Sequence, residues 1–326
     1  MKKRLSSILL LLLGLAGVAR AAGPKVYISV DMEGIAGVVT GDQLGPQGFE
    51  YQRFREFMTG ETLAAIEGAR AAGASEFVVS DSHGNGENLL IEKFPKDVSI
   101  VRSWPRPLVM MQGIDASFAA AMFVGYHTST VNPAGVRAHT MSSANFADVK
   151  LNGRSVPEAG LNAAIAGHFG VPVVLVTGDD AVVKEVAALL GPIEGAVVKW
   201  SYGFHSARTL TPEAACDLIR AKAKSAIERL VGAGVSGGRT RRMSRPSAAA
   251  AADDARSAPA QFRPYKIAEP LDLEIRFKNY RPAEVLAYLP IVERTDAHSI
   301  RFRAKDILEA TRFLEFLLHY EPGLTP

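Results

Sequence analysis

Two acidic side chains end the first predicted strand of the chain. Asp31 and Glu33 stand one residue apart in ISVDMEG, residues 28–34. Side chains at i and i+2 of a strand point to one face, so both carboxylates project together at its carboxyl end. Gly34 is expected to let the chain turn away without crowding a bound ion. Adjacent carboxylates repel each other, so a buried pair needs a shared proton or a cation. Taken alone, the pair is either two solvated acids at a strand end or part of a site.

Three of the seven histidines lie in settings that favour a site. His83 follows the predicted strand FVVSD, His127 follows AMFVGY, and His139 comes shortly afterwards in VRAHTM. In an open α/β sheet, the carboxyl ends of the strands form the edge where sites gather. Neutral imidazole with carboxylate oxygen is a typical ligand set for zinc. The sequence therefore predicts a metal site at the sheet edge that carries Asp31 and Glu33.

Glu158 is a fifth candidate ligand, in the first turn of the helix predicted after Pro157. An acid at this position also complements the positive end of the helix dipole, so spacing leaves both roles open. His168 and His319 belong to predicted helices and are interpreted as structural. Asp179 and Asp180 follow a strand and open a helix, which is typical of N-capping, and a supporting hydrogen-bond role near the site is the alternative.

Alternating strand-like and helix-like segments from residue 25 onward must position these side chains. Apolar runs such as KVYISVD and VPVVLVTGDD are typical of buried strands, and amphipathic helical patterns separate them. This order predicts an α/β fold with a mostly parallel sheet flanked by helices. Towards the C-terminal end, LDLEIRF and HSIRFRA alternate like half-exposed strands before a closing amphipathic helix. A smaller C-terminal α+β portion is therefore expected.

The domain boundaries follow from composition. Residues 22–232 are predicted to form the α/β metal-binding catalytic domain, and residues 265–326 the C-terminal α+β portion. Between them, residues 233–264 are rich in Ala, Gly, Ser, Pro and Arg and poor in large apolar side chains. Such a composition cannot bury enough surface to fold alone, which favours a disordered linker or insertion. A basic partner-binding arm is the alternative interpretation of the same stretch.

Residues 1–21 have the features of a secretory signal peptide. Cations at 2–4 precede the apolar run ILLLLLGLAGVA, and the A-x-A pattern at 19–21 predicts cleavage after Ala21. The apolar run is short for a membrane span of about 20 residues, which disfavours an uncleaved anchor. We therefore expect an exported protein, periplasmic or secreted, without a stable membrane anchor. Its single cysteine, Cys216, excludes an internal disulfide.

The charge balance argues against a nucleic-acid partner. The formal net charge of +3 becomes −1 when the four cations of the leader are removed. Residues 233–264 carry six Arg and two Asp, so the remaining body has a formal net charge of −5. A body without a basic bias does not suggest binding to nucleic acid.

Five short motifs, SVDMEGIAG, DSHG, GYH, AHTM and PEAGLNA, occur in this order along the chain. In these motifs the chain closely resembles the DppA-type D-aminopeptidases, a family of binuclear zinc metallopeptidases. The resemblance extends over roughly residues 25–230 and resumes over about 268–320. Five ordered motifs are far more specific than any one of them.

The resemblance implies a role for each candidate residue. Two zinc ions per chain would be held by five residues, namely Asp31, Glu33, His83, His127 and Glu158. Asp31 is implied as the bridge between the ions, with Glu33 and His83 completing one protein ligand set. His127 and Glu158 would complete the other. His139 is implied as a catalytic histidine that is not a ligand.

The implied activity is hydrolysis of short peptides or amides with an N-terminal D-amino acid, such as D-Ala-D-Ala, by a metal-bridging hydroxide. The family also implies a ring-shaped homo-oligomer such as a decamer. Two alternatives differ in function: an amidase acting on amino-acid amides or cell-wall fragments, and a non-catalytic exported metal- or solute-binding protein. The chain keeps His139 as well as all five implied ligands, and this argues against the non-catalytic alternative. The leader and residues 233–264 depart from the family pattern.

Overall fold

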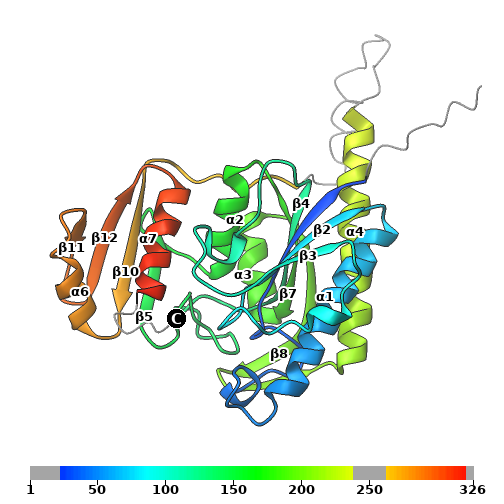
Figure 1. Ribbon diagram of the computed structural model, residues 1–326, viewed down its shortest axis with the longest axis horizontal. Coiled ribbons are helices and arrows are strands. Elements are labelled where there is room, and N and C mark those ends of the chain that lie inside the picture. Colours follow the sequence, from blue (N-terminus) through cyan, green and yellow to red (C-terminus); the bar gives the residue numbers. More distant parts are fainter. Residues whose placement is uncertain (1–22, 238–261, 321–326) are drawn as a thin grey trace, which may run out of the picture.

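The computed structural model describes residues 23–237 and 262–320, which fold into two sheets with helices packed around them (Figure 1). The larger sheet has the strand order β3-β2-β1-β4-β7-β8-β9. Neighbouring strands are parallel except for β9, which pairs antiparallel with β8. The expected mostly parallel sheet is therefore confirmed. Its strands are β1 (Lys25–Val30), β2 (Glu76–Asp81), β3 (Val98–Val101), β4 (Ala120–Tyr126), β7 (Val173–Asp179), β8 (Glu194–Gly203) and β9 (Ser206–Thr209).

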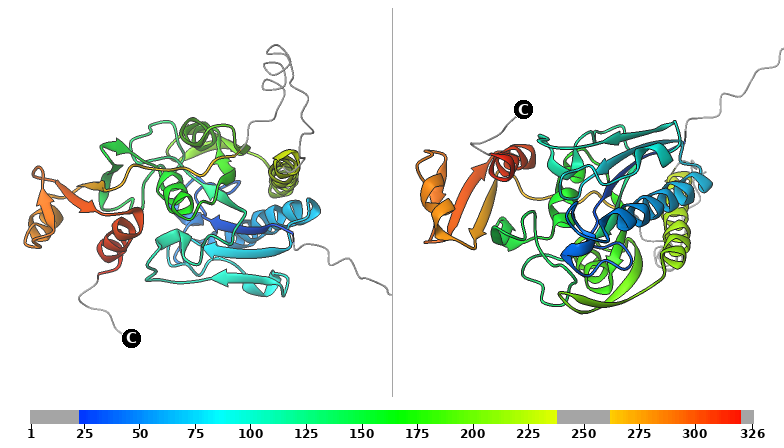
Figure 2. Two further views of the ribbon diagram at one scale, coloured as in Figure 1. Left: turned by 90° about the horizontal axis from the view of Figure 1, so that it is seen from above. Right: turned by 60° about the horizontal axis from the view of Figure 1, so that its bottom comes forward.

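Helices cover both faces of this sheet (Figure 1, Figure 2). Side chains of α1 and α4 share one apolar core with alternate residues of the central strands, and α2 and α3 share the core on the opposite face. Because both faces are covered, every residue of β4 and β7 is buried, which explains their continuous apolar sequences. The four helices are α1 (Tyr51–Ala71), α2 (Glu158–His168), α3 (Asp180–Leu190) and α4 (Pro212–Gly237).

Local signals in the sequence explain where helices begin and end. Asp179 is the N-cap of α3, as expected, and its Oδ1 accepts a hydrogen bond from the Val182 amide at 2.7 Å. Its Oδ2 accepts from the Val136 amide at 2.7 Å, which ties the loop after β4 to the start of α3. Gly73 lies just beyond α1 with φ of +100°, a conformation that favours glycine.

The smaller sheet is antiparallel and lies beside the α/β body (Figure 1). Its strand order is β11-β12-β10-β5-β6. It is not built from C-terminal residues alone, because β5 and β6 come from between β4 and α2. Two helices, α6 (Tyr280–Leu286) and α7 (Ile307–His319), accompany it. The strands are β5 (Phe146–Leu151), β6 (Arg154–Ser155), β10 (Leu271–Phe277), β11 (Val292–Arg294) and β12 (Ser299–Ala304).

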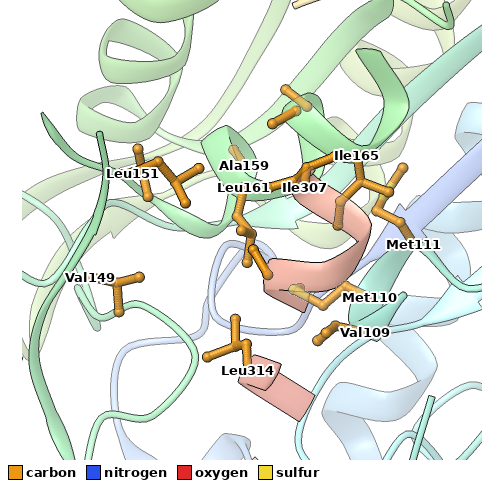
Figure 3. Packing of buried hydrophobic residues seen from close by; sticks show 14 of the residues in the cluster. Val109, Met110, Met111, Val149, Leu151, Ala159, Leu161, Ile165, Ile307 and Leu314 are labelled. Carbon is orange, nitrogen blue, oxygen red and sulfur yellow. The ribbon is translucent and has the colours of Figure 1, made fainter. Parts of the chain in front are cut away.

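A shared apolar core joins the two sheets. Figure 3 shows Ile307 and Leu314 of α7 near Leu161 and Ile165 of α2, together with Met110 from the loop between β3 and β4. All five side chains are buried in one cluster that also includes residues of β5 and β10. The cluster holds α7 against the α/β body, and this places the C-terminal portion beside the carboxyl edge of the larger sheet.

The predicted linker and leader lie largely outside the described residues. The helix α4 continues to Gly237, so residues 233–237 are helical rather than part of a linker. The rest of the stretch up to residue 261, and the predicted signal peptide at 1–21, are not among the described residues. Within the described ranges, no helix is both long and apolar enough to cross a membrane.

Candidate metal centre

Three neighbouring strands and one helix deliver the predicted ligands to one place. Asp31 and Glu33 follow β1, His83 follows β2, and His127 directly follows β4. These strands are adjacent and parallel, so their carboxyl ends share one edge of the sheet. Glu158 is the first residue of α2. Its side chain lies within the cluster, against His127 and His139, which is where a ligand would have to lie.

Short distances connect the members of this cluster. The Asp31 Oδ1 atom lies 3.2 Å from His83 Nδ1, and Asp31 Oδ2 lies 3.1 Å from His127 Nε2. Glu33 Oε2 lies 2.9 Å from His83 Nδ1, and Glu158 Oε2 lies 3.3 Å from His127 Nε2. One oxygen of Asp31 therefore faces each histidine–carboxylate pair, as a bridging carboxylate would.

The donor set fits divalent cations. Asp31, Glu33, His83, His127 and Glu158 are each at most 7% exposed. Asp31 Oδ2, Glu33 Oε2 and His127 Nε2 are buried without a hydrogen-bond partner in the described part of the chain. Buried polar atoms without partners are costly, and a cation in their midst would satisfy them. The donor atoms form two groups, each within 4.8 Å: one of Asp31, Glu33 and His83, the other of His127, His139 and Glu158.

Backbone carbonyls orient the rings of His83 and His127. His83 Nε2 donates to the Leu44 carbonyl at 2.6 Å, which leaves Nδ1 to face the carboxylates. His127 Nδ1 lies 3.0 Å from the Thr128 carbonyl, and this contact leaves Nε2 to face the carboxylates. A carbonyl that accepts from one ring nitrogen fixes the neutral tautomer whose other nitrogen can bind a metal.

The carboxylates of the cluster raise the pKa values of its two most buried histidines. Burial lowers the pKa of His83, but the charge of Glu33 and the contact with Asp31 outweigh burial and raise this pKa well above its usual value. Burial likewise lowers the pKa of His127, yet Glu158 and Asp31 raise it well above the usual value. Burial raises the pKa of Asp31, but contacts with the two histidines hold it below its usual range. Positive charge is therefore favoured where the three carboxylates converge on the two histidines, as expected of a cation site.

His139 differs from the five buried residues. Its side chain is 14% exposed, and its Nε2 lies 3.5 Å from Glu158 Oε1. The ring stacks on that of His127, with centroids 4.0 Å apart and planes 11° apart. His139 Nδ1 donates to the Arg137 carbonyl at 2.8 Å, so Nε2 is the free nitrogen. By distance His139 could join the second donor group, whereas its partial exposure suits contact with a substrate.

The cluster opens into a cavity of about 440 Å³. The α/β body contributes the acidic cluster, His83 and His139 to its lining, and α7 contributes Leu317 and His319. Trp104, from the loop after β3, stacks on His319 with ring centroids 5.3 Å apart. This size suits a small molecule or a short peptide.

Comparison with known proteins shows the family of this chain. The family model described as D-aminopeptidase, peptidase family M55, matches residues 25–237 and 231–316. The chain belongs to the D-aminopeptidase family. A D-aminopeptidase of Bacillus subtilis (strain 168) is 32% identical over 287 residues, which cover 88% of this chain and 93% of the relative. The expected class, a metallo-aminopeptidase, is confirmed by this membership.

A solved structure of this D-aminopeptidase family supports the same assignment. It is described as the Zn-dependent D-aminopeptidase DppA from Bacillus subtilis, a self-compartmentalizing protease. It superposes with a TM-score of 0.77 at 29% identity, and the match covers 92% of this chain and all of that one. Both the larger parallel sheet and the smaller antiparallel portion therefore belong to the family fold.

Lys199 is a buried residue beside the candidate metal centre that was not predicted from the sequence. It lies in β8, and its Nζ donates to the carbonyls of Glu33, Ile35 (3.1 Å) and Val38 (2.7 Å). The ammonium group thereby holds the loop that carries two of the predicted ligands. Burial lowers the pKa of Lys199 to about 8. The sequence signal was a lysine between the apolar residues Val198 and Trp200.

The structure adds detail to two other expectations near the site. His319, interpreted as structural, stacks on Trp104 and lies 3.1 Å from Glu315 Oε2, and it also lines the cavity from α7. Gly34 was expected to let the chain turn without crowding the ions, but the close contact at Gly34 is with the backbone of β4. A Cβ atom on Gly34 would lie 2.1 Å from the carbonyl oxygen of Tyr126, at the end of β4. Glycine therefore allows the loop after β1 to lie directly against β4.

Proposed function

We propose that this chain is a zinc-dependent aminopeptidase that removes the N-terminal D-amino acid from short peptides such as D-Ala-D-Ala. One observation carries the proposal: the two oxygens of Asp31 face two histidine–carboxylate pairs, within a family of D-aminopeptidases. Asp31 would be shared by two zinc ions. Glu33 and His83 would complete one ligand set, and His127 and Glu158 the other.

Bound zinc would supply Lewis acidity towards the scissile carbonyl and towards water. The protein contributes the remaining chemistry. His139 has a free Nε2 atom beside Glu158 and next to the cavity. At this position it can accept a proton from the attacking water and pass it to the leaving amine, or donate to the developing oxyanion. The carboxylates of the cluster are available to hold the free amino group of the substrate close to the metals.

Stereochemistry and metal content test this proposal together. The zinc-loaded protein is incubated with D-Ala-D-Ala and with L-Ala-L-Ala, and free alanine is measured. Bound zinc is counted by elemental analysis, and a chelator-treated sample serves as control. We expect faster release from the D-peptide, about two zinc ions per chain, and loss of activity on chelation. Preferential cleavage of the L-peptide, or clearly fewer than two metals in the active protein, would refute the proposal.

The role of His139 is tested separately. His139→Ala is expected to keep its zinc and lose about 100- to 10,000-fold in kcat, the usual contribution of an acid–base group. His168→Ala, which changes a histidine at the C-terminal end of α2, is the matched control. Zinc content distinguishes the two possible roles, because loss of one metal from His139→Ala would make this residue a ligand rather than a proton carrier.

We also propose that the protein is exported, to the periplasm or the medium. The support is the order of charged, apolar and small residues within 1–21. There the enzyme would meet peptides released from the cell wall. Mass spectrometry of the mature protein should find a new N-terminus after Ala21. An intact leader on active protein in the cytoplasm would contradict this proposal.

A homo-oligomer, in the form of a ring such as a decamer, is the final part of the proposal. Its support is the similar DppA structure, which is described as self-compartmentalizing. The C-terminal portion also presents large exposed apolar side chains, which is typical of an interface. These include Tyr280, Val285, Tyr288 and Ile291, which are at least 52% exposed.

A further inference from the structure

Arg137 lines the cavity, and the proposed reaction gives this cationic side chain no role. It is the single Arg or Lys among the described residues that line the cavity. No carboxylate of the described chain lies within ion-pair distance of it, and its Nε is buried without a hydrogen-bond partner. A guanidinium with open donors beside a substrate cavity is suited to bind an anion from solution.

The fold holds Arg137 firmly in this position. The hairpin formed by β8 and β9 packs against it: the Arg137 amide donates to the Phe204 carbonyl at 3.0 Å, and the guanidinium lies 5.0 Å from the Phe204 ring centroid. Arg137 Nη1 lies 3.5 Å from His205 Nδ1. The residue has φ of +56°, a left-handed conformation that costs a non-glycine residue energy and recurs at functional sites. Its own carbonyl orients His139.

The charges of the site indicate which anion Arg137 would meet. Asp31, Glu33 and Glu158 line the cavity with negative charge, which favours the positively charged amino end of a peptide at that side. Arg137 supplies positive charge on the same wall as His139. A cavity of about 440 Å³ holds a di- or tripeptide rather than a long chain. A bound short peptide would therefore bring its C-terminal carboxylate within the same small space as Arg137.

We propose that Arg137 binds the C-terminal carboxylate of the peptide substrate and makes the enzyme selective for short peptides over amides. This inference rests on the proposed function and narrows its substrate class. A guanidinium can bind a carboxylate through two parallel N–H bonds, and an amide lacks the negative charge that strengthens them. Arg137 would thus be a specificity-determining residue.

The ratio of two specificity constants tests this inference. We compare kcat/KM for D-Ala-D-Ala with kcat/KM for D-alaninamide, in the zinc-loaded wild type and in Arg137→Met. Charge-assisted hydrogen bonds of ordinary strength predict that the peptide-to-amide ratio falls about 10- to 100-fold in the variant. Arg137→Lys keeps the charge without the planar fork, so it should retain an intermediate ratio. Arg208→Met, which removes a cation of β9 that does not line the cavity, is the control.

The outcomes separate the inference from the proposed function. If the wild type cleaves neither D-compound, the proposed function fails, and the substrate inference fails with it. If the wild type cleaves the peptide but Arg137→Met lowers both constants by the same factor, the inference alone is refuted. Circular dichroism and zinc content of Arg137→Met are measured first. If the methionine variant does not fold, the same peptide-to-amide comparison is made with Arg137→Lys, whose ratio should still lie below that of the wild type.

Discussion

Asp31 is the residue that connects the two halves of the proposed metal centre. Its two carboxylate oxygens face His83 and His127 at 3.2 and 3.1 Å, whereas Glu33 faces His83 alone. The isosteric change Asp31→Asn removes the negative charge but keeps the shape. It should lower zinc binding at both positions, so that purified protein holds little zinc.

The matched variant Glu33→Gln should lose mainly one of the two ions. Zinc per chain, measured by elemental analysis after dialysis at several free zinc concentrations, distinguishes the two variants. A two-step binding curve in which only one step is shifted is expected for Glu33→Gln. Equal losses in Asp31→Asn and Glu33→Gln would show that Asp31 does not bridge.

Glu61 on α1 couples stability to pH. Burial raises its pKa to about 7, although the amide of Ala36 and the charge of Lys199 act in the opposite direction. The usual value is 4.5, so ionised Glu61 disfavours the folded state. Its stabilising contribution is complete below about pH 4.5 and is lost as the pH rises through about 7. The difference corresponds to about 3 kcal/mol.

Glu61→Gln should remove this pH dependence, because the glutamine side chain does not titrate. Its amide oxygen can still accept the hydrogen bond that the Ala36 amide donates to Glu61 at 2.8 Å. The free energy of unfolding of the variant relative to wild type should therefore increase by about 3 kcal/mol between pH 4.5 and 8. Urea unfolding at a series of pH values measures this difference. A difference that stays constant with pH would show that Glu61 does not titrate in this range.

At the scale of elements, the contact between the loop after β1 and the end of β4 positions the ligands. Gly34 leaves no space for a side chain against Tyr126, whereas a Cβ atom added to Gly41 in the same loop would have no other atom within 4 Å. Gly34→Ala must therefore displace the loop, and the strain is expected to cost about 1–3 kcal/mol of stability.

Because Glu33 immediately precedes Gly34, the same displacement should weaken zinc binding. Thermal unfolding with and without zinc measures both effects, and Gly41→Ala is the control that should resemble wild type. If Gly34→Ala kept full stability and zinc affinity, the close approach of this loop to β4 would not matter to the site.

At the scale of the whole molecule, exposed apolar side chains of the C-terminal portion predict association. Tyr288 is 81% exposed and Ile291 is 63% exposed, close to the end of α6. The wild type should elute with a mass several times that of one chain, as measured by light scattering. Tyr288→Lys combined with Ile291→Lys should shift the population towards smaller species while zinc content stays unchanged. Val231→Lys on α4 is the control, and a monomeric wild type would contradict the prediction.

The fold class and the candidate ligands at the strand ends could be predicted from local patterns in the chain. Asp31, Glu33, His83 and His127 were recognisable because buried strands have continuous apolar sequences and parallel strands share a carboxyl edge. These are local patterns, with an element and a face encoded within a few residues. The family motifs then added the roles that spacing could not distinguish.

Long-range packing determines which distant side chains join these residues. It turned Glu158 towards the cluster, placed the Lys199 ammonium under the loop after β1, and brought His319 to the cavity. It also joined β5 to the C-terminal strands. The physical reason is that these contacts depend on how helices and sheets pack across long sequence separations. Local periodicity specifies the buried face of an element, but not the partner that covers it.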